Sequence, residues 1–303
     1  MKEIGEGGFG TVFHMIWNRP NNKKVDVAAK RLFKVDKHEL NVLSTLSHPN
    51  IVRLIGVVSE PIHFMLVLEL CEGGSLRSHL SRNSTEPLHR DLLRYWPQQA
   101  AKAIEYLQDM GVIHKDVKSD NYLIACNNIL KLADFGLAKL SDKTLNQATE
   151  RGTAAYMAPE LFTEGSLSPK FDIFAYGVVL WEIVTRQIPW KGKGYHVIVF
   201  GVCHNGERLS IPEDCPEDLA YLMRQCWQTD RRKRPSIKKI LSVLEKRHLP
   251  CTPTPQIFMG KLFACLLHLL TSKVLLLSKL IFNPTRANQA DVDNGEFILQ
   301  TNH

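Results

Sequence analysis

The sequence changes character once, at the turn-forming run Cys71-Glu72-Gly73-Gly74. Four short β-branched and apolar runs precede this break and are typical of strands, at 11–17, 25–31, 54–58 and 64–70. Residues 37–46 place leucines at helical spacing among them. After the break, apolar residues recur every three to four positions in longer ranges, 90–110, 168–186, 195–205, 216–228 and 235–247. The pattern predicts an α+β fold with a small β-rich N-lobe, one helix beside its sheet, and a larger, mainly helical C-lobe.

Composition narrows the functional class. The 303 residues are 44% hydrophobic and 23% charged, which is an ordinary globular balance. Lys and Arg outnumber Asp and Glu by 38 to 31 and are spread along the chain, so we expect a solvated basic surface and no nucleic-acid partner. The seven cysteines form no CxxC pair, and the N-terminus lacks an apolar signal segment. These features favour a reducing, cytoplasmic location.

One run carries the strongest chemical signal, and it reads His114-Lys115-Asp116-Val117-Lys118-Ser119-Asp120-Asn121. Asp116 is suited to orient a hydroxyl group and accept its proton, and Lys118 to offset charge on a moving phosphoryl group. Asn121 and the later Asp134 supply hard oxygen ligands of the kind that Mg²⁺ prefers. The run therefore predicts phosphoryl transfer.

Two N-terminal features fit a nucleotide site. The glycine-rich run 4–10 is followed by a strand-like segment, whereas a dinucleotide-binding turn should open a helix. Its backbone N–H groups could approach phosphates closely, although a plain hairpin would look the same in isolation. Lys30 ends the apolar run Val27-Ala28-Ala29, which resembles the Val-Ala-Ile-Lys pattern of the protein kinases, and that resemblance implies a contact with the α- and β-phosphates; a solvated strand-end lysine is the alternative.

Taken together, these motifs and Asp134-Phe135-Gly136 resemble the eukaryotic protein kinases. The resemblance implies ATP and Mg²⁺ as cofactors, Asp116, Lys118 and Asn121 as catalytic residues, and Asn121 and Asp134 as metal ligands. It also implies a set of ATP-binding positions, namely Ile4, Gly5, Gly7, Gly10, Val12, Ala28, Lys30, Glu39, Glu69, Cys71, Leu123 and Asp134. By the same resemblance, Leu68 is the gatekeeper, and a regulatory stack contains Leu43, Leu54, His114 and Phe135.

A second triplet, His89-Arg90-Asp91, matches the family's His-Arg-Asp more closely than His114-Lys115-Asp116 does. Downstream spacing decides between them, because positions two and five after Asp91 hold leucine and tryptophan, whereas those after Asp116 hold lysine and asparagine. We therefore expect Asp91 to lie in the first turn of a helix.

Lys118 and the segment Gly152-Thr153 indicate serine/threonine rather than tyrosine kinases, with Thr153 near Asp116 and Lys118. Cys226-Trp227 and Arg234-Pro235-Ser236 resemble the tyrosine-kinase-like branch, which includes mixed-lineage and receptor-interacting kinases. The resemblance further implies a Glu160–Arg234 ion pair and a central helix anchored by Asp172 and Gly177. Hydroxyl groups between Gly136 and Thr153 are candidate phosphosites, namely Ser141, Thr144 and Thr149.

Three departures from the family pattern favour the alternative of a pseudokinase, a scaffold that binds ATP but is catalytically weak. Only eight residues separate Lys30 from its expected partner Glu39, and Lys115 replaces an arginine that could clamp a phosphorylated loop. Three residues precede Ile4, so almost no first strand is expected, and a truncated product is one interpretation.

The predicted kinase domain is 1–248, with an N-lobe at 1–70, a hinge near 69–74 and a C-lobe at 75–248. The tail 249–303 begins with a proline-rich linker and contains an apolar segment, 261–282, interrupted by His268, Lys273 and Lys279. These basic residues disfavour a membrane span. Packing on the core or on a partner, lying on a membrane surface, and remaining unstructured stay open as interpretations.

Overall fold

The structure is a computed structural model that describes residues 2–7, 10–19, 23–32, 40, 43–59, 64–82, 88–134, 153–163 and 168–246. These residues belong to one compact unit that includes residues 1–247, and a second unit, 248–296, lies outside the described residues. The predicted tail and its segment 261–282 are therefore not described. Within the described part, no helix is both long and apolar enough to cross a membrane.

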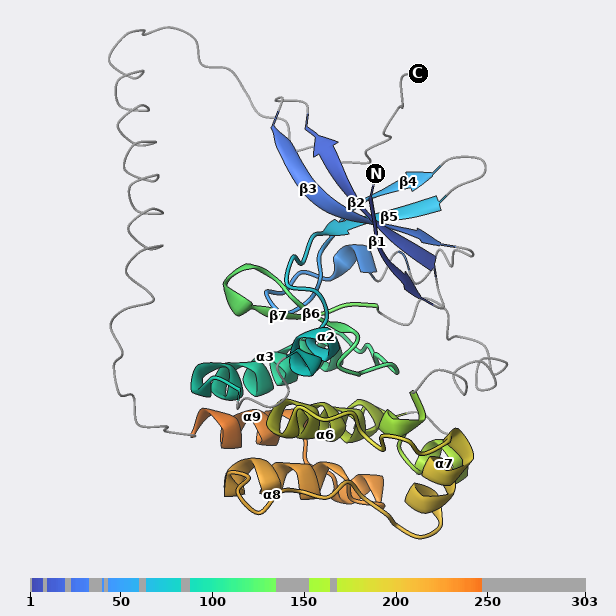
Figure 1. The fold of residues 1–303 in the computed structure, drawn as a ribbon, viewed down its shortest axis with the longest axis vertical. Coiled ribbons are helices and arrows are strands. Elements are labelled where there is room, and N and C mark those ends of the chain that lie inside the picture. Colours follow the sequence, from blue (N-terminus) through green and yellow to red (C-terminus); the bar gives the residue numbers. More distant parts are fainter. Residues whose placement is uncertain are drawn as a thin grey trace, which may run out of the picture. The chain divides into compact units, whose positions relative to one another are not determined.

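The N-terminal part is an antiparallel sheet in the order β1-β2-β3-β5-β4, seen in the upper half of Figure 1. Its strands are β1 (Lys2–Gly7), β2 (Gly10–Asn18), β3 (Lys24–Leu32), β4 (Leu54–Ser59) and β5 (Phe64–Glu69). The expectation of almost no first strand is wrong, because β1 pairs with β2 from Lys2 to Gly7. The pairing contains a register shift between Glu3 and Gly5, which is typical of a β-bulge.

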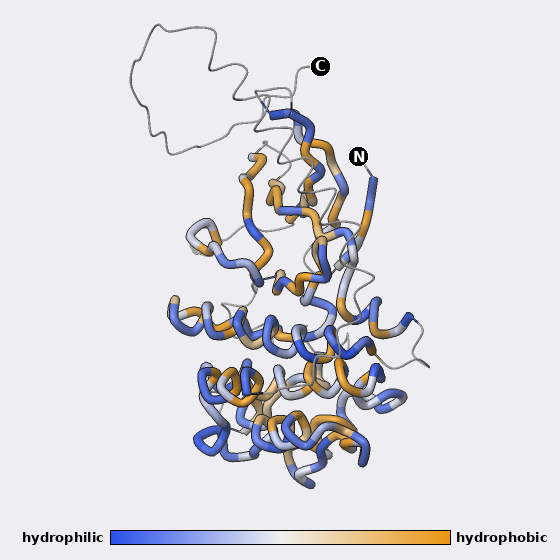
Figure 2. Tube along the Cα trace, turned by 90° about the vertical axis from the view of Figure 1, so that its left-hand side faces the viewer, coloured by the Kyte–Doolittle hydropathy of each residue, from blue (hydrophilic) through white to orange (hydrophobic). Residues whose placement is uncertain are grey.

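The C-terminal part is mainly helical, and its elements follow the sequence pattern closely. Its longer helices are α3 (Arg90–Asp109), α6 (Lys170–Thr185), α7 (Tyr195–Cys203), α8 (Glu217–Cys226) and α9 (Ile237–Glu245). Helix α6 is buried on all sides from Phe171 to Ile183. Apolar residues of α3, α8 and α9 recur at helical spacing, as expected where one face packs inward, and Figure 2 shows hydrophobic and hydrophilic residues mixed through the helical part.

Sequence periodicity missed two short helices, α2 (Leu76–Ser81) and α5 (Glu160–Thr163). A six-residue helix shows barely more than one repeat of the helical period, so only its cap is informative. Ser75 provides that cap, because its hydroxyl accepts a hydrogen bond from the Ser78 N–H at 3.2 Å. The cap places the start of α2 directly after the glycine break.

A small hairpin joins the two parts. It consists of β6 (Tyr122–Ile124) and β7 (Leu130–Leu132), with 3-10 turn η1 (Cys126–Asn128) between them. The N–H of Val52 donates to the carbonyl of Leu132 at 2.9 Å, and the N–H of Leu132 donates to Asn50 at 2.8 Å. The Asn50 side chain also donates to the Leu130 carbonyl at 2.8 Å. The residues that precede β4 are thus fixed to the hairpin rather than to the sheet alone.

Gly177 lies in the middle of α6, where α8 crosses it. A Cβ atom at this position would lie 2.6 Å from Trp227 Nε1 and 2.7 Å from Cys226 Cβ. The sequence expectation that Gly177 anchors the central helix therefore has a steric basis, because any side chain would push α8 away.

We predict that Gly177→Ala lowers the free energy of unfolding by about 1–3 kcal/mol, because the added methyl group overpacks a closed contact. Urea denaturation of the two proteins measures the difference. Gly56→Ala is the matched control, since a Cβ at Gly56 would meet nothing within 4 Å. Equal stability of the two variants would contradict the steric account of Gly177.

Candidate active site

A pocket lies between the sheet and the β6–β7 hairpin. Apolar side chains from both parts form much of its wall, and several polar groups lie at one end. Its lining residues are Ile4, Val12, Ala28, Lys30, Leu43, Val52, Leu66, Leu68, Glu69, Leu70, Cys71, Asp120, Asn121, Leu123, Ala133 and Asp134. An apolar slot with a few convergent polar groups is the usual form of a small-molecule site.

The structure places eight of the predicted ATP-binding positions in this pocket, namely Ile4, Val12, Ala28, Lys30, Glu69, Cys71, Leu123 and Asp134. Sequence reasoning missed Val52, Leu66, Leu70, Asp120 and Ala133 as lining residues. Most of them are small or apolar side chains with no motif of their own. Only the pairing of distant strands could have revealed them.

Ile4 is the one described residue of the glycine-rich run in the pocket wall, and the predicted glycines Gly5, Gly7 and Gly10 are not among the lining residues. Gly5 and Gly7 are part of β1, and Gly10 is the first residue of β2. A Cβ at Gly10 would lie 1.8 Å from the carbonyl oxygen of Arg31, so the neighbouring strand β3 requires glycine here. Gly10 thus has a packing reason that does not depend on phosphate.

Lys30 contacts Asp134 directly, through an ion pair between its ammonium group and Oδ1 of the carboxylate. Lys30 comes from β3 and is 8% exposed, and Asp134 follows β7 with a positive φ of 63°. Residues other than glycine rarely adopt that conformation, and such residues gather at functional sites. Glu39, the expected partner of Lys30, lies outside the described residues, so that ion pair stays a prediction.

The carboxylate of Asp116 is buried and contacts the two other predicted catalytic residues. Lys118 Nζ donates to Asp116 Oδ2 at 2.8 Å, and the side-chain amide of Asn121 donates to the same oxygen at 3.0 Å. Asn121 Nδ2 also donates to the Asp116 carbonyl at 2.7 Å. These bonds fix the Asn121 amide so that its Nδ2 faces Asp116 and its Oδ1 points away from that carboxylate.

The residues before Asp116 are held by Asp172, in the first turn of α6. Its two carboxylate oxygens accept the backbone N–H groups of His114, at 2.8 Å, and Lys115, at 3.0 Å. Lys115 has a φ of 68°, so this strained turn depends on the bonds that hold it. Burial raises the pKa of Asp172, and the His114 ring and these N–H groups act against that rise. The anchoring role expected for Asp172 therefore has a definite contact.

His114 supports the loop from the inside. The His114 ring receives the Asp116 N–H on Nδ1 at 3.2 Å, and its Nε2 lies 3.0 Å from the Ala133 carbonyl, just before Asp134. The His114 ring therefore lies between the segment of Asp116 and the segment of Asp134 and contacts both. Leu43, another member of the predicted stack, is buried, whereas Phe135 lies outside the described residues.

The competing triplet has the structural role that its spacing predicted. Helix α3 begins at Arg90, and the ring of the cap residue His89 accepts from the Asp91 N–H at 3.3 Å. Asp91 is exposed in the first turn. Its position is thus explained by helix capping.

A second polar cluster, which the sequence did not indicate, lies beside this loop. Glu182, near the end of α6, binds Arg77 Nη1 at 2.6 Å and accepts hydrogen bonds from Ser119 Oγ and the Tyr156 hydroxyl, each at 2.8 Å. Ser119 lies inside the loop of Asp116, and Tyr156 belongs to the 3-10 turn η3 (Thr153–Tyr156). We call Arg77, Ser119, Tyr156 and Glu182 the Arg77 cluster.

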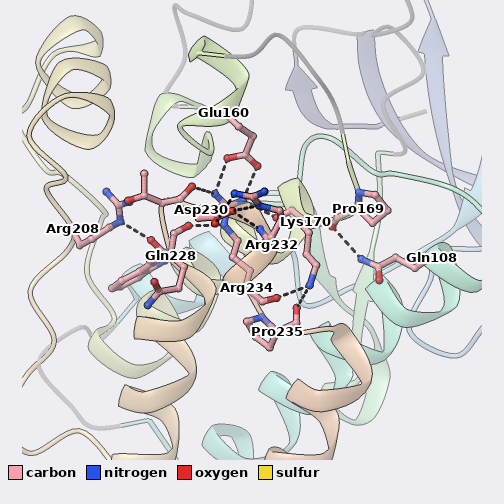
Figure 3. A network of polar contacts seen from close by, with 12 residues as sticks. Gln108, Glu160, Pro169, Lys170, Arg208, Gln228, Asp230, Arg232, Arg234 and Pro235 are labelled. Atoms are coloured by element: carbon pink, nitrogen blue, oxygen red, sulfur yellow. Dashed lines mark hydrogen bonds and ion pairs between the residues drawn. The ribbon is translucent and has the colours of Figure 1, made fainter.

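The segment after η3 is fixed by a buried ion pair. Arg234 Nη1 and Nη2 each lie 2.6 Å from a carboxylate oxygen of Glu160, which confirms the predicted pair. Figure 3 shows Arg234 between Glu160 and Lys170, whose carbonyl accepts from Arg234 Nη1 at 3.0 Å. Arg234 Nε also donates to the Gln228 carbonyl at 2.8 Å. Arg234 therefore joins α5, α6 and the turn before α9.

Several predicted residues lie outside what the structure describes. They are Gly136, the candidate phosphosites Ser141, Thr144 and Thr149, and the side chain of Thr153. The expected position of Thr153 near Asp116 and Lys118 therefore stays a prediction. The five described cysteines are free, as Cys71, Cys126, Cys203, Cys215 and Cys226.

Comparison with known proteins gives a consistent result. The family described as protein tyrosine and serine/threonine kinase matches residues 1–244. Mitogen-activated protein kinase kinase kinase 12 of Rattus norvegicus is 35% identical over 254 residues, which are 84% of this chain and 28% of that protein. Mitogen-activated protein kinase kinase kinase mlk-1 of Caenorhabditis elegans is 35% identical over 253 residues, 72% of this chain and 24% of that protein.

A third relative, the probable serine/threonine-protein kinase drkD of Dictyostelium discoideum, is 36% identical over 253 residues. Those residues are 80% of this chain and 19% of that protein. The chain thus spans roughly a fifth to just over a quarter of the length of these relatives.

We predict that Arg234→Met lowers the free energy of unfolding by about 3–5 kcal/mol, because it leaves the buried carboxylate of Glu160 without its cation. The double variant Arg234→Met/Glu160→Gln should lose less than the sum of the two single losses, since no uncompensated charge then remains. Urea denaturation measures all three. Arg232→Met, which removes an exposed partner of Asp230, is the control and should leave stability unchanged. Additive losses in the double variant would contradict this account.

Proposed function

This chain belongs to the protein tyrosine and serine/threonine kinase family, and we propose that it transfers the γ-phosphoryl group of ATP to serine and threonine hydroxyls of proteins. One observation carries the proposal. The carboxylate of Asp116 accepts hydrogen bonds from Lys118 and Asn121. Asn121 lines the same pocket as Lys30 and Asp134, which form an ion pair. A base, two cations and two oxygen ligands are therefore assembled within one site.

The residues at this end fit ATP and Mg²⁺ by their chemistry. Asn121 offers an amide oxygen and Asp134 a carboxylate, which are hard ligands of the type that Mg²⁺ binds. When bound, Mg²⁺ would neutralise charge on the phosphates. Lys30, buried against Asp134, is placed to bind phosphate oxygens, and the apolar walls at Val12, Ala28 and Leu123 suit an adenine ring.

Asp116 is assigned the role of orienting the acceptor hydroxyl and taking its proton. Its carboxylate is held by two donors, so it stays in one orientation while a hydroxyl approaches. Lys118 carries a positive charge next to that carboxylate and can stabilise negative charge on the transferring group. Restricting the base in this way lowers the entropic cost of reaching the reactive geometry.

We further propose a signalling role of the tyrosine-kinase-like type, because the curated relatives are named as mitogen-activated protein kinase kinase kinases. The proposed domain spans 1–248, with the lobes meeting at the hinge near 69–74. Five free cysteines among the described residues support the proposed cytoplasmic location. Contact of 261–282 with a membrane surface or a partner helix stays a prediction.

We predict that Asp116→Asn lowers the rate of phosphate transfer by about 100-fold or more, since a general base contributes roughly 10²–10⁴-fold. ATP affinity should stay within about twofold, because Asp116 is not in the wall of the nucleotide pocket. Asp91→Asn is the matched control, as it alters the same residue type in the competing triplet. Radiolabelled ATP with mixed histones as acceptor measures transfer, and fluorescent-nucleotide displacement measures binding.

The same experiment distinguishes an enzyme from a pseudokinase scaffold. Wild-type protein that binds ATP but transfers no more phosphate than Asp134→Ala would overturn the proposal. Loss of transfer in Asp91→Asn, with Asp116→Asn still active, would reassign the base to the other triplet.

A further inference from the structure

The Arg77 cluster is built around a carboxylate that has no access to solvent. The side chain of Glu182 is 0% exposed, and its three neighbours Arg77, Ser119 and Tyr156 come from three different segments. A charged group buried in this way is costly unless every neighbour compensates it. We therefore expect the cluster to lose stability when one of its compensating members is removed.

Arg77 contacts each of these segments. Beyond Glu182, its Nη2 donates to the Tyr156 hydroxyl at 2.5 Å, and its Nε lies 3.6 Å from Asp120 Oδ2. Its backbone N–H donates to the Ser119 carbonyl at 3.1 Å. One guanidinium thus spans α2, the loop of Asp116, turn η3 and helix α6. The planar fork of arginine can serve several acceptors at once, which a lysine cannot.

The contacted loop residues lie between two groups assigned to the reaction. Ser119 and Asp120 are the only residues between Lys118 and Asn121, and Asn121 in turn holds the carboxylate of Asp116. Tyr156 lies in the turn that precedes the segment fixed by Glu160 and Arg234. Arg77 itself does not line the nucleotide pocket. Any influence on catalysis must therefore pass through the loop and through η3.

We propose that Arg77 is a positioning residue for phosphate transfer, which keeps the loop of Asp116 in register with turn η3 through Glu182. The inference rests on the proposed kinase function and deepens it. Without the Arg77 guanidinium, Glu182 would keep only two neutral donors, and Asp120 would lose its side-chain contact with α2. A displacement of about 1 Å in a catalytic group can cost on the order of 100-fold in rate.

Protonation of Glu182 offers an independent readout. Burial raises the pKa of Glu182 to about 7, and Arg77, Tyr156 and Ser119 act against that rise, whereas Asp120 adds to it. The titratable groups that face it are Arg77, Tyr156 and Asp120. Below its pKa the carboxyl is neutral and the ion pair with Arg77 is lost, so the cluster is complete only as the pH rises through about 7.

The first test compares Arg77→Gln with wild type at saturating ATP, using mixed histones as acceptor. We expect kcat to fall at least about tenfold, while ATP affinity changes less than about twofold. Rates are normalised to the fraction of protein that binds ATP, so misfolded molecules do not count. Arg224→Gln is the matched control, because Arg224 pairs with Glu217 on the surface at 3.1 Å. Equal kcat in both variants would overturn the proposal.

The second test uses Glu182→Gln, alone and combined with Arg77→Gln. If Arg77 acts through Glu182, the double variant should keep at least about half of the kcat of the slower single variant. The rise of kcat through pH 7 should flatten in Glu182→Gln and shift to higher pH in Arg77→Gln, where the opposing cation is gone. Multiplied losses, or a pH profile unchanged from wild type, would refute the coupling.

Arg77→Lys covers the case in which Arg77→Gln does not fold. Lysine keeps a cation for Glu182 but lacks the fork that also reaches Tyr156 and Asp120, so we expect normal ATP binding with reduced kcat. Wild-type rates in Arg77→Lys would overturn the multi-segment role. Inactivity of the wild-type protein would instead refute the kinase function itself, which keeps the two failures distinct.

Discussion

Helix α6 is the constraint on which the rest of the helical part depends. It is buried along almost its whole length, yet it carries two carboxylates, Asp172 near its start and Glu182 near its end. Each carboxylate accepts hydrogen bonds from the loop of Asp116. Asp172 accepts them from the backbone of His114 and Lys115, and Glu182 accepts one from Ser119. Gly177 lies midway between them and lets α8 close against the helix. Two carboxylates ten positions apart on one helix therefore hold the reactive loop at two places.

The nucleotide-facing end of the site depends on contacts that cross between sheet and hairpin. Lys30 from β3 meets Asp134 after β7, and Glu69 at the end of β5 binds Lys131 Nζ at 2.8 Å. The same Glu69 carboxylate accepts the Arg53 N–H at 2.8 Å. Charged groups shielded from water interact more strongly than exposed ones. These partly buried contacts thus hold the two sides of the pocket together where its polar groups converge.

The fold and the reactive residues were readable from sequence because their signals are local. Strand alternation, helical spacing and the offsets from Asp116 to Lys118 and Asn121 all lie within a few residues. The first strand was missed because glycines hide the strand pattern, and α2 because it spans barely more than one helical repeat. The Arg77 cluster joins residues that lie 26 to 105 positions apart in the sequence. The residues next to Arg77 and Glu182 give no sign that the Arg77 side chain is half-buried and that of Glu182 is buried. Such contacts follow from packing, which the residue pattern does not record.

The attachment of residues 50–52 to β7 has a mechanical consequence. The backbone bonds between Val52, Leu132 and Asn50 lie on β7, two residues before Asp134. If the sheet rotates relative to the helices, these bonds form the pivot, and points far from them travel furthest. The rim at Ile4 and Val12 would then move through a wide arc while the polar end changes little. In that case a nucleotide would enter and leave at the rim, where the two sides of the pocket would separate furthest.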